Sequence, residues 1–164
     1  MLRIEQLKKD HIKDNFDCGV DSLNKYISHY ARQNDEKNIS RTFVAVDDDN
    51  LIQAYYSICA ASVRIEDLPE NISKRLPRYP VPAARLSRLA VDLNKQGTGL
   101  GEHLLLNALK RIYLTSHEMG IKCILVDAIE NKAKAFYENY GFISLPNQDL
   151  KLFLPIETIN KLFD

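Results

Sequence analysis

The sequence lacks the features that mark several large classes of protein. Its three cysteines are scattered along 164 residues, which argues for reduced thiols rather than a disulfide framework. No apolar run approaches the roughly 18 residues of a membrane-spanning helix. The segment from Met1 to Asp10 has no apolar core, so we expect no export signal and no contact with a membrane. These absences predict a cytoplasmic protein.

An excess of charge of one sign is also missing. Lys and Arg together number 22, and so do Asp and Glu, so the net charge is zero and gives no electrostatic sign of a nucleic-acid partner. The four histidines show neither metal-ligand nor catalytic-triad spacing, and no G-x-S-x-G motif occurs. Metalloenzymes and serine hydrolases therefore have no support, and we expect no bound metal.

A glycine-rich stretch from Gln96 to Gly101 is the feature around which the rest of the chain is arranged. The apolar run before it, residues 86–91, predicts a strand, and the helical spacing of apolar residues after Leu100 predicts a long helix. A glycine-rich turn that leads into a helix directs several unpaired amides at one point, where the helix dipole also favours negative charge. The stretch is therefore either a cradle for phosphate groups or a plain tight turn. Its spacing fits neither a P-loop nor a dinucleotide-binding motif.

A length of 164 residues suits one domain, residues 1–164, and the apolar periodicity along it indicates a mixed α/β sheet. The acidic residues 47–49 predict the turn of a hairpin, because three consecutive carboxylates in a turn point in different directions and suit solvent better than a metal. The expected elements are a short strand ending at Leu7, a helix capped by Asp21, strands 41–46 and 51–63, a loop over 70–83, strand 86–91, a helix from Leu100 with Gly120 as its C-cap, strand 123–128, a helix between Asn131 and Gly141, strands 142–145 and 150–154, and a helix 156–163.

The span of residues 71–91 is basic and contains no acidic residue. Such a segment is either a solvated loop or a surface that faces an anion or RNA, and the sequence leaves both open. Arg85 and Arg88 lie at or within the strand that leads to the glycine-rich stretch, which favours a functional role for these two. The candidate substrate-binding or RNA-binding residues are Arg75, Arg78, Arg85 and Arg88.

Two motifs resemble those of the GNAT superfamily of N-acetyltransferases. Gln96-x-x-Gly99-x-Gly101 resembles its pyrophosphate-binding loop, and Phe136-Tyr137-x-x-x-Gly141-Phe142 resembles its F-Y-x-x-x-G-F signature. The resemblance implies a twisted mixed sheet of six to seven strands, with flanking helices and a splayed central strand pair, and acetyl-CoA as the co-substrate. The residues that it implies as contacts of acetyl-CoA are Leu89, Ala90, Val91, Gln96, Gly97, Thr98, Gly99, Leu100, Gly101, Asn131 and Phe136.

The same resemblance makes Tyr137 the expected general acid. A tyrosine hydroxyl with a pKa of about 10 is mostly protonated at pH 7 and can give its proton to the departing CoA thiolate. Spacing alone would also fit a packing residue on an amphipathic helix, and Tyr140 is the competing candidate. Residues 85–91 offer arginines and no glutamate base, which suits an α-amine on a polyanion, because an α-amine of pKa roughly 7.7–8.0 is partly neutral already. A backbone N–H near Val91 is expected to polarise the acetyl carbonyl.

Further segments are similar to the TacT-like toxins of toxin–antitoxin modules. Phe16-Asp17-Cys18-Gly19, followed by Leu23-Asn24-Lys25-Tyr26, resembles their opening F-x-C-G…L-N-x-[FY], and residues 152–159 resemble their ending. This resemblance implies a toxin that acetylates the α-amino group of aminoacyl-tRNA and blocks translation, a ribbon-helix-helix antitoxin as partner, and a homodimer. The alternatives are a GNAT enzyme that acts on a small-molecule amine or a protein N-terminus, and a catalytically silent CoA-binding module.

Overall fold

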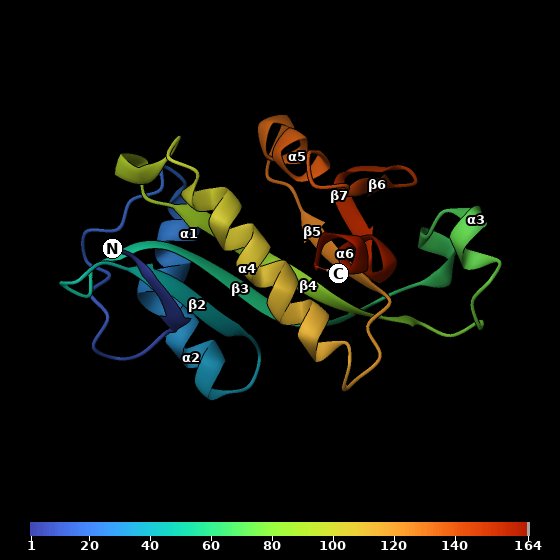
Figure 1. Ribbon diagram of the computed structural model, residues 1–164, viewed down its shortest axis with the longest axis horizontal. Helices are drawn as coiled ribbons and strands as arrows, with labels where there is room; N and C mark the ends of the chain where they lie inside the picture. The colour runs from blue at the N-terminus through green and yellow to red at the C-terminus, as the bar shows by residue number, and fades with distance from the viewer. Residues whose placement is uncertain (164) are drawn as a thin grey trace. The chain divides into compact units, whose positions relative to one another are not determined.

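The computed structural model describes residues 1–163, which form a seven-stranded mixed sheet with flanking helices (Figure 1). The strand order is β1-β2-β3-β4-β5-β7-β6. This confirms the expected α/β class and strand number, while the splay of the central strand pair stays a prediction. The elements are β1 (Arg3–Gln6), α1 (Asp21–Lys25), a π-helical turn (Tyr26–Tyr30), α2 (Ala31–Glu36), β2 (Arg41–Val46), β3 (Ile52–Val63), a 3₁₀ turn (Ile65–Asp67), α3 (Glu70–Ser73), β4 (Val81–Val91), a 3₁₀ turn (Leu93–Lys95), α4 (Leu100–Thr115), β5 (Cys123–Asp127), α5 (Asn131–Glu138), β6 (Ile143–Leu145), β7 (Gln148–Pro155) and α6 (Ile156–Phe163).

The described chain divides into two compact units. Unit 1 comprises residues 1–59 and 86–109, and unit 2 comprises residues 60–85 and the described residues from 110 onward. Strands β3 and β4 and helix α4 each contribute residues to both units. The expectation of a single domain over residues 1–164 stays a prediction.

In unit 1, β2 pairs in antiparallel fashion with both β1 and β3. The turn between β2 and β3 is built by Asp47, whose carboxylate accepts hydrogen bonds from the amides of Asp49 (2.9 Å) and Leu51 (3.0 Å). Asn50 completes the turn with a positive φ of 64°, which asparagine tolerates better than most residues. The hairpin and the acidic turn that the sequence predicts are therefore confirmed.

The segment from α1 to α2 packs one face against this hairpin (Figure 1). Leu23 and Ala31, at helical spacing, belong to the same core cluster as Tyr55 of β3. The predicted N-cap is wrong by one residue, since Val20, in an extended conformation, precedes the helix and Asp21 is its first residue. The Asp21 carboxylate still lies in the first turn, where the helix dipole favours negative charge.

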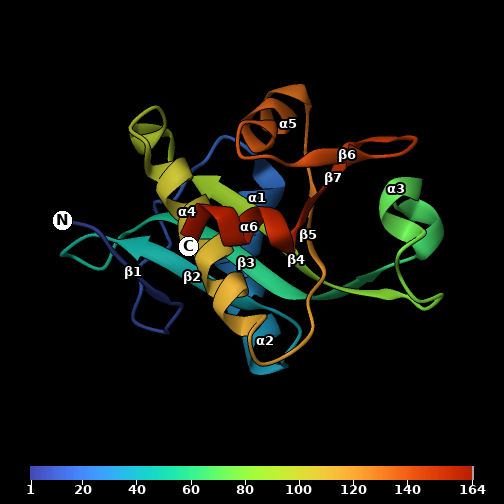
Figure 2. The ribbon, with the colours of Figure 1, turned by 45° about the vertical axis from the view of Figure 1, so that its right-hand side comes forward.

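In unit 2, β7 pairs in antiparallel fashion with β5 and with β6. The first four residues of β5 are buried, as the continuous apolar run predicts for a strand covered on both faces. Helix α6 follows β7 directly (Figure 2). The ring of its Phe163 lies 5.9 Å from the ring of Tyr113 in the last turns of α4. Gly141, with a φ of 98°, follows α5 and stops it as predicted.

Two predictions for unit 2 are wrong. Residues 70–83 are not a loop throughout, because α3 occupies Glu70–Ser73 and β4 begins at Val81. Pro82 fits within a strand because its carbonyl accepts the amide of Lys122 (2.9 Å), and this contact needs no N–H from the proline. Gly120 is not the C-cap of α4, which ends at Thr115; Gly120 lacks the positive φ that such a cap requires.

Within residues 1–163, no helix combines the length and the apolar character needed to cross a membrane. In the same part of the chain, no cluster of three or more His, Cys, Asp or Glu side chains has the arrangement of a metal site.

Candidate functional site

The glycine-rich loop lies in unit 1, between β4 and α4. Gly97 and Gly99 have φ angles of 78° and 87°, which residues with a side chain rarely adopt, and no atom lies within 4 Å of the position that a Cβ would take on either. Among residues 1–163, no acceptor takes a hydrogen bond from the amides of Gly97 to Glu102. Because these amides stand at the start of a 16-residue helix, they form a cradle for an anion.

Two polar side chains hold the loop in shape. The side-chain amide of Gln96 donates to the carbonyls of Val91 (2.9 Å) and Cys18 (3.1 Å). The buried carboxylate of Asp92 accepts the amide of Asn94 (2.9 Å) and caps the short 3₁₀ turn before the loop. Gln96 thus ties the loop to the end of β4 and to the segment before α1, a role that the motif alone does not reveal.

The other residues expected to contact acetyl-CoA in unit 1 flank this loop. Ala90 is buried in the core, whereas Leu89 and Val91 on either side of it are half-buried at the end of β4. Thr98 is exposed, and its hydroxyl donates to the carbonyl of Lys95 in the 3₁₀ turn before the loop. Leu100 opens α4 with a buried side chain, and Gly101 follows it.

Arg88 is held against an aromatic ring in unit 1. Its guanidinium carbon lies 3.6 Å from the centre of the Tyr26 ring, which is a cation–π contact. Tyr26 is itself fixed, because its hydroxyl shares a hydrogen bond of 2.8 Å with Ser40 and its ring stacks on Tyr55. No carboxylate among residues 1–163 forms an ion pair with Arg88, so a half-buried positive charge stands in a fixed position without a partner of opposite sign. Such a group suits an incoming phosphate or carboxylate.

Tyr137, the expected proton donor, lies in α5 of unit 2. Its side chain is 8% exposed, and its ring makes edge contacts with Phe136 (5.3 Å between centroids) and Phe142 (5.5 Å). Burial raises the pKa of the Tyr137 hydroxyl well above its ordinary value, and no hydrogen bond to another described residue opposes this shift. The hydroxyl is therefore protonated at neutral pH, as a proton donor must be.

The other two expected contacts of acetyl-CoA in α5 differ in their surroundings. Phe136 is half-buried and packs its ring on both Tyr137 and Tyr140, which makes it a supporting residue of the candidate acid. Asn131 is exposed as the first residue of the helix.

The candidate RNA-binding arginines of unit 2 also differ from one another. Arg75 and Arg78 are exposed between α3 and β4 and form no ion pair with another described residue. Arg85 in β4 donates to the Asp127 carboxylate at 2.8 Å. The acid-free stretch of sequence therefore finds an acidic partner on another strand, and composition could not indicate this.

Each unit brings together part of the expected site. Unit 1 contains the glycine-rich loop, the end of β4 and Arg88, and unit 2 contains Tyr137, Asn131, Phe136 and the other three arginines. Tyr26 and Asp127 are functional candidates that the sequence did not reveal as partners of Arg88 and Arg85. The only signal available was for Tyr26, which lies in a segment that resembles the opening motif of the toxins.

Comparison with known proteins assigns more than half of the chain to one family. The model of the acetyltransferase (GNAT) domain family matches residues 38–144. A tRNA-acetylating toxin from Mycobacterium tuberculosis is 37% identical over 139 residues, which cover 85% of this chain and 82% of that protein.

Solved structures are similar over almost the whole chain. AtaT complexed with acetyl-methionyl-tRNAfMet has a TM-score of 0.93 at 29% identity and covers 100% of both chains. A tyrosine-to-phenylalanine mutant of the AtaT toxin, bound to the C-terminus of the antitoxin AtaR and to acetyl-CoA, has a TM-score of 0.83 at 28% identity, with 99% of this chain and 98% of that chain covered.

Proposed function

The chain belongs to the GNAT acetyltransferase family, and on this premise we propose that it transfers an acetyl group from acetyl-CoA to the α-amino group of an aminoacyl-tRNA, as a toxin that blocks translation. The observation that carries the proposal is the open cradle of amides from Gly97 to Glu102. A diphosphate fits such a cradle, and the similar AtaT toxin binds both acetyl-CoA and an acetylated aminoacyl-tRNA.

In this proposal, the glycine-rich loop binds the pyrophosphate of acetyl-CoA, and the backbone of Leu89 to Val91 pairs with the pantetheine arm. The positive φ angles of Gly97 and Gly99 support this role, because they keep side chains out of the space in front of the amides. Asn131 and Phe136 are the proposed contacts in α5.

Acetyl-CoA supplies the activated acetyl group, and the chain supplies a proton and a polarising N–H. The α-amine of an esterified amino acid is partly neutral near pH 8 and needs no strong base to attack. As the new C–N bond forms and the C–S bond breaks, the Tyr137 hydroxyl gives its proton to the departing thiolate, and the proton that the acylated nitrogen loses restores the phenol. Burial raises the pKa of Tyr137, so the phenol is protonated at neutral pH and the donor form is present when the thiolate leaves. The N–H near Val91 is the proposed donor to the carbonyl oxygen.

The basic residues of β4 and of the segment before it are the proposed contacts of the RNA. Arg88 supports this best, since its charge is fixed on Tyr26 and has no carboxylate partner among residues 1–163. Arg75 and Arg78 are exposed and could approach phosphates directly, whereas Arg85 would have to share its guanidinium with Asp127.

We propose a ribbon-helix-helix antitoxin as the partner, a homodimer as the assembly and the cytoplasm as the location. The complex of the similar AtaT toxin with the C-terminus of the antitoxin AtaR supports an antitoxin as the partner. The reading frame next to the gene is the simplest test, because an antitoxin of this type would be encoded there.

Zero net charge favours a second candidate, an acetyltransferase for a small-molecule amine or a protein N-terminus, because polyanion binders usually carry excess positive charge. Incubating the protein with labelled acetyl-CoA and with charged or uncharged tRNA separates the candidates. We expect label only on charged tRNA. Transfer only to small amines would establish the second candidate, and no transfer to any amine would leave a silent CoA-binding module.

A further inference from the structure

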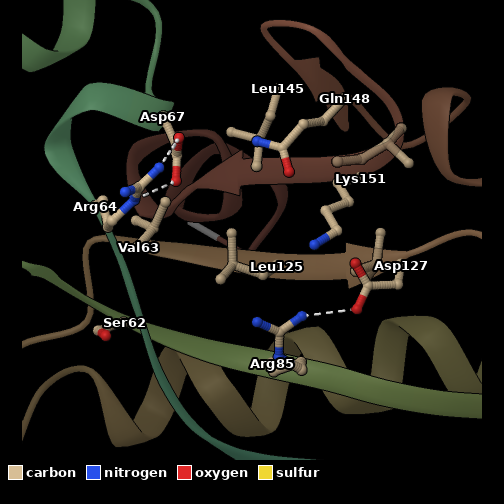
Figure 3. Close-up of a pocket in the computed structure, with 12 residues that line it drawn as sticks. Ser62, Val63, Arg64, Asp67, Arg85, Leu125, Asp127, Leu145, Gln148 and Lys151 are labelled. Carbon is tan, nitrogen blue, oxygen red and sulfur yellow. Dashed lines mark hydrogen bonds and ion pairs between the residues drawn. The ribbon is translucent and has the colours of Figure 1, made fainter.

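Unit 2 contains a cavity of about 130 Å³, and Arg85 and Asp127 are the only residues of its lining that have been given a role above (Figure 3). It is lined by β4, β5, β6 and β7 and by the end of β3 with the 3₁₀ turn that follows it. Its floor is apolar, formed in part by the buried residues Val63, Leu125 and Leu145. Its rim carries five charged side chains, and their arrangement decides what the cavity can bind: Arg64, Asp67, Arg85, Asp127 and Lys151.

Both carboxylates of the rim are already bound by arginine. Asp67 accepts two hydrogen bonds from Arg64, at 3.1 and 3.2 Å, and this contact lowers the pKa of the Asp67 carboxyl. Asp127 accepts one from Arg85 at 2.8 Å. Since the side chains of Arg85 and Asp127 are 32% and 50% exposed, their pair adds little to stability. Its effect is to hold a guanidinium at the cavity with most of its N–H groups unused.

Lys151 of β7 has no such partner. It is the one cation of this rim that forms no ion pair with another described residue, and Figure 3 shows it pointing from β7 toward Arg85 and Asp127. Three cations and two carboxylates leave the rim with one uncompensated positive charge. No aromatic side chain lines the cavity, so it offers no surface on which a nucleobase could stack. An oxyanion group with a short aliphatic portion fits these features.

The cavity also lies close in the chain to the candidate proton donor. Asp127 is the last residue of β5, and three residues separate it from α5, which carries Tyr137. Lys134 of α5 is bound to Asp149 of β7 at 2.6 Å, which ties that helix to the strand of Lys151.

We propose that this cavity binds an oxyanion of the acceptor substrate and that Lys151 is the residue that holds it. The proposal rests on the proposed function for the identity of the acceptor. The oxyanion is either a phosphate near the 3′ end of the RNA or a side-chain carboxylate of the esterified amino acid.

The first experiment measures anion binding without acetyl transfer. The full chain is saturated with CoA, so that the glycine-rich loop is filled, and its melting temperature is followed as inorganic phosphate or glutamate is added. We expect phosphate, glutamate or both to raise the melting temperature of the wild type but not that of Lys151→Ala. The control is Lys161→Ala, which replaces an exposed lysine on α6 and should be stabilised like the wild type. Equal stabilisation of all three proteins, or of none, would overturn the proposal.

The second experiment identifies the source of the oxyanion. For Lys151→Ala we expect KM for charged tRNA to rise about tenfold with kcat unchanged, and Lys151→Arg to restore it. If the oxyanion is a phosphate, the slope of log KM against log salt falls by about 0.7, and KM for puromycin, an aminoacyl-nucleoside without phosphate, does not change. If it is a carboxylate, the loss is confined to tRNA charged with aspartate or glutamate.

The two proposals fail in different ways. Wild-type protein that acetylates no charged tRNA but still shows anion stabilisation dependent on Lys151 would overturn the proposed function and leave the anion site. Wild-type protein that acetylates charged tRNA, with Lys151→Ala kinetically the same as Lys161→Ala on every acceptor, would overturn the role of Lys151 and leave the proposed function.

Discussion

Replacing Tyr137 by phenylalanine removes a single oxygen atom from a side chain that is held by ring contacts. The contacts with Phe136 (5.3 Å) and Phe142 (5.5 Å) involve only the ring and persist in the variant. The hydroxyl forms no hydrogen bond with another described residue, so its loss leaves no buried partner unpaired. We therefore expect the free energy of unfolding to change by less than about 1 kcal/mol.

The catalytic effect should be far larger than the structural one. A positioned proton donor typically contributes about 10²- to 10⁴-fold, so kcat of Tyr137→Phe should fall by that factor while the Kd of acetyl-CoA is unchanged. Thiol release in a single turnover measures the first quantity, and calorimetric titration measures the second. Tyr140→Phe, which alters the competing tyrosine on the other side of Phe136, is the matched control and should retain activity.

The pH profile tests the same assignment without a mutation. Because burial raises the pKa of Tyr137, its phenol stays protonated throughout the range in which the α-amine, with a pKa of roughly 7.7–8.0, loses its proton. The wild-type kcat/KM should rise to about pH 8 and then stay level to about pH 10. A decline between pH 8 and 10, or a Tyr137→Phe variant with near wild-type kcat, would refute the reasoning.

Three further variants test other parts of the structure. Gly99→Ala forces an alanine to a φ of 87°, so it should lower the free energy of unfolding by about 1 kcal/mol and abolish CoA binding measured by calorimetry. The control Gly120→Ala, at an open position without positive φ, should change neither quantity. Burial raises the pKa of Cys123 to about 11, so the thiol ionises in the unfolded chain at a lower pH than in the folded chain. The free energy of unfolding, measured with urea, should therefore fall between about pH 9 and 11 by at most about 2–3 kcal/mol. It should fall less in Cys123→Ala. Arg88→Lys keeps the charge but loses the planar contact with Tyr26, so the free energy of unfolding should drop by about 1 kcal/mol and KM for charged tRNA should rise. An unchanged KM would refute a role of Arg88 in RNA binding.

Local patterns in the sequence were sufficient to predict most elements of the fold. The bounds of β2 and α6 and the first residue of α4 agree with the apolar periodicity, because each of these elements buries one regular face. The failures occurred where a residue is used in an unusual way. Pro82 stops an isolated strand, yet here it lies within β4 because the neighbouring strand needs only its carbonyl.

The candidate site also contains features that the sequence predicts and features that it does not. The glycine-rich loop was predictable because its residues are contiguous and its backbone angles follow from glycine itself. The partners of the arginines were not, because Arg88 meets Tyr26 and Arg85 meets Asp127 only after the chain has folded. Contacts between distant positions depend on strand order and register, and a single sequence read by itself indicates neither.

Zero net charge favours a small-molecule or protein acceptor only as a sum over the chain, and it weighs less against an RNA substrate once the position of each charge is known. At physiological ionic strength an exposed charge acts over only about 8 Å, so a bound phosphate senses its neighbours and not the sum over 164 residues. The two carboxylates on the rim of the unit 2 cavity, Asp67 and Asp127, are each bound by an arginine, which offsets their charge. Arg88 and Lys151, which have no such partner among the described residues, set the local potential. A neutral chain can thus present positive sites to a polyanion, provided that its acidic side chains near those sites are already occupied.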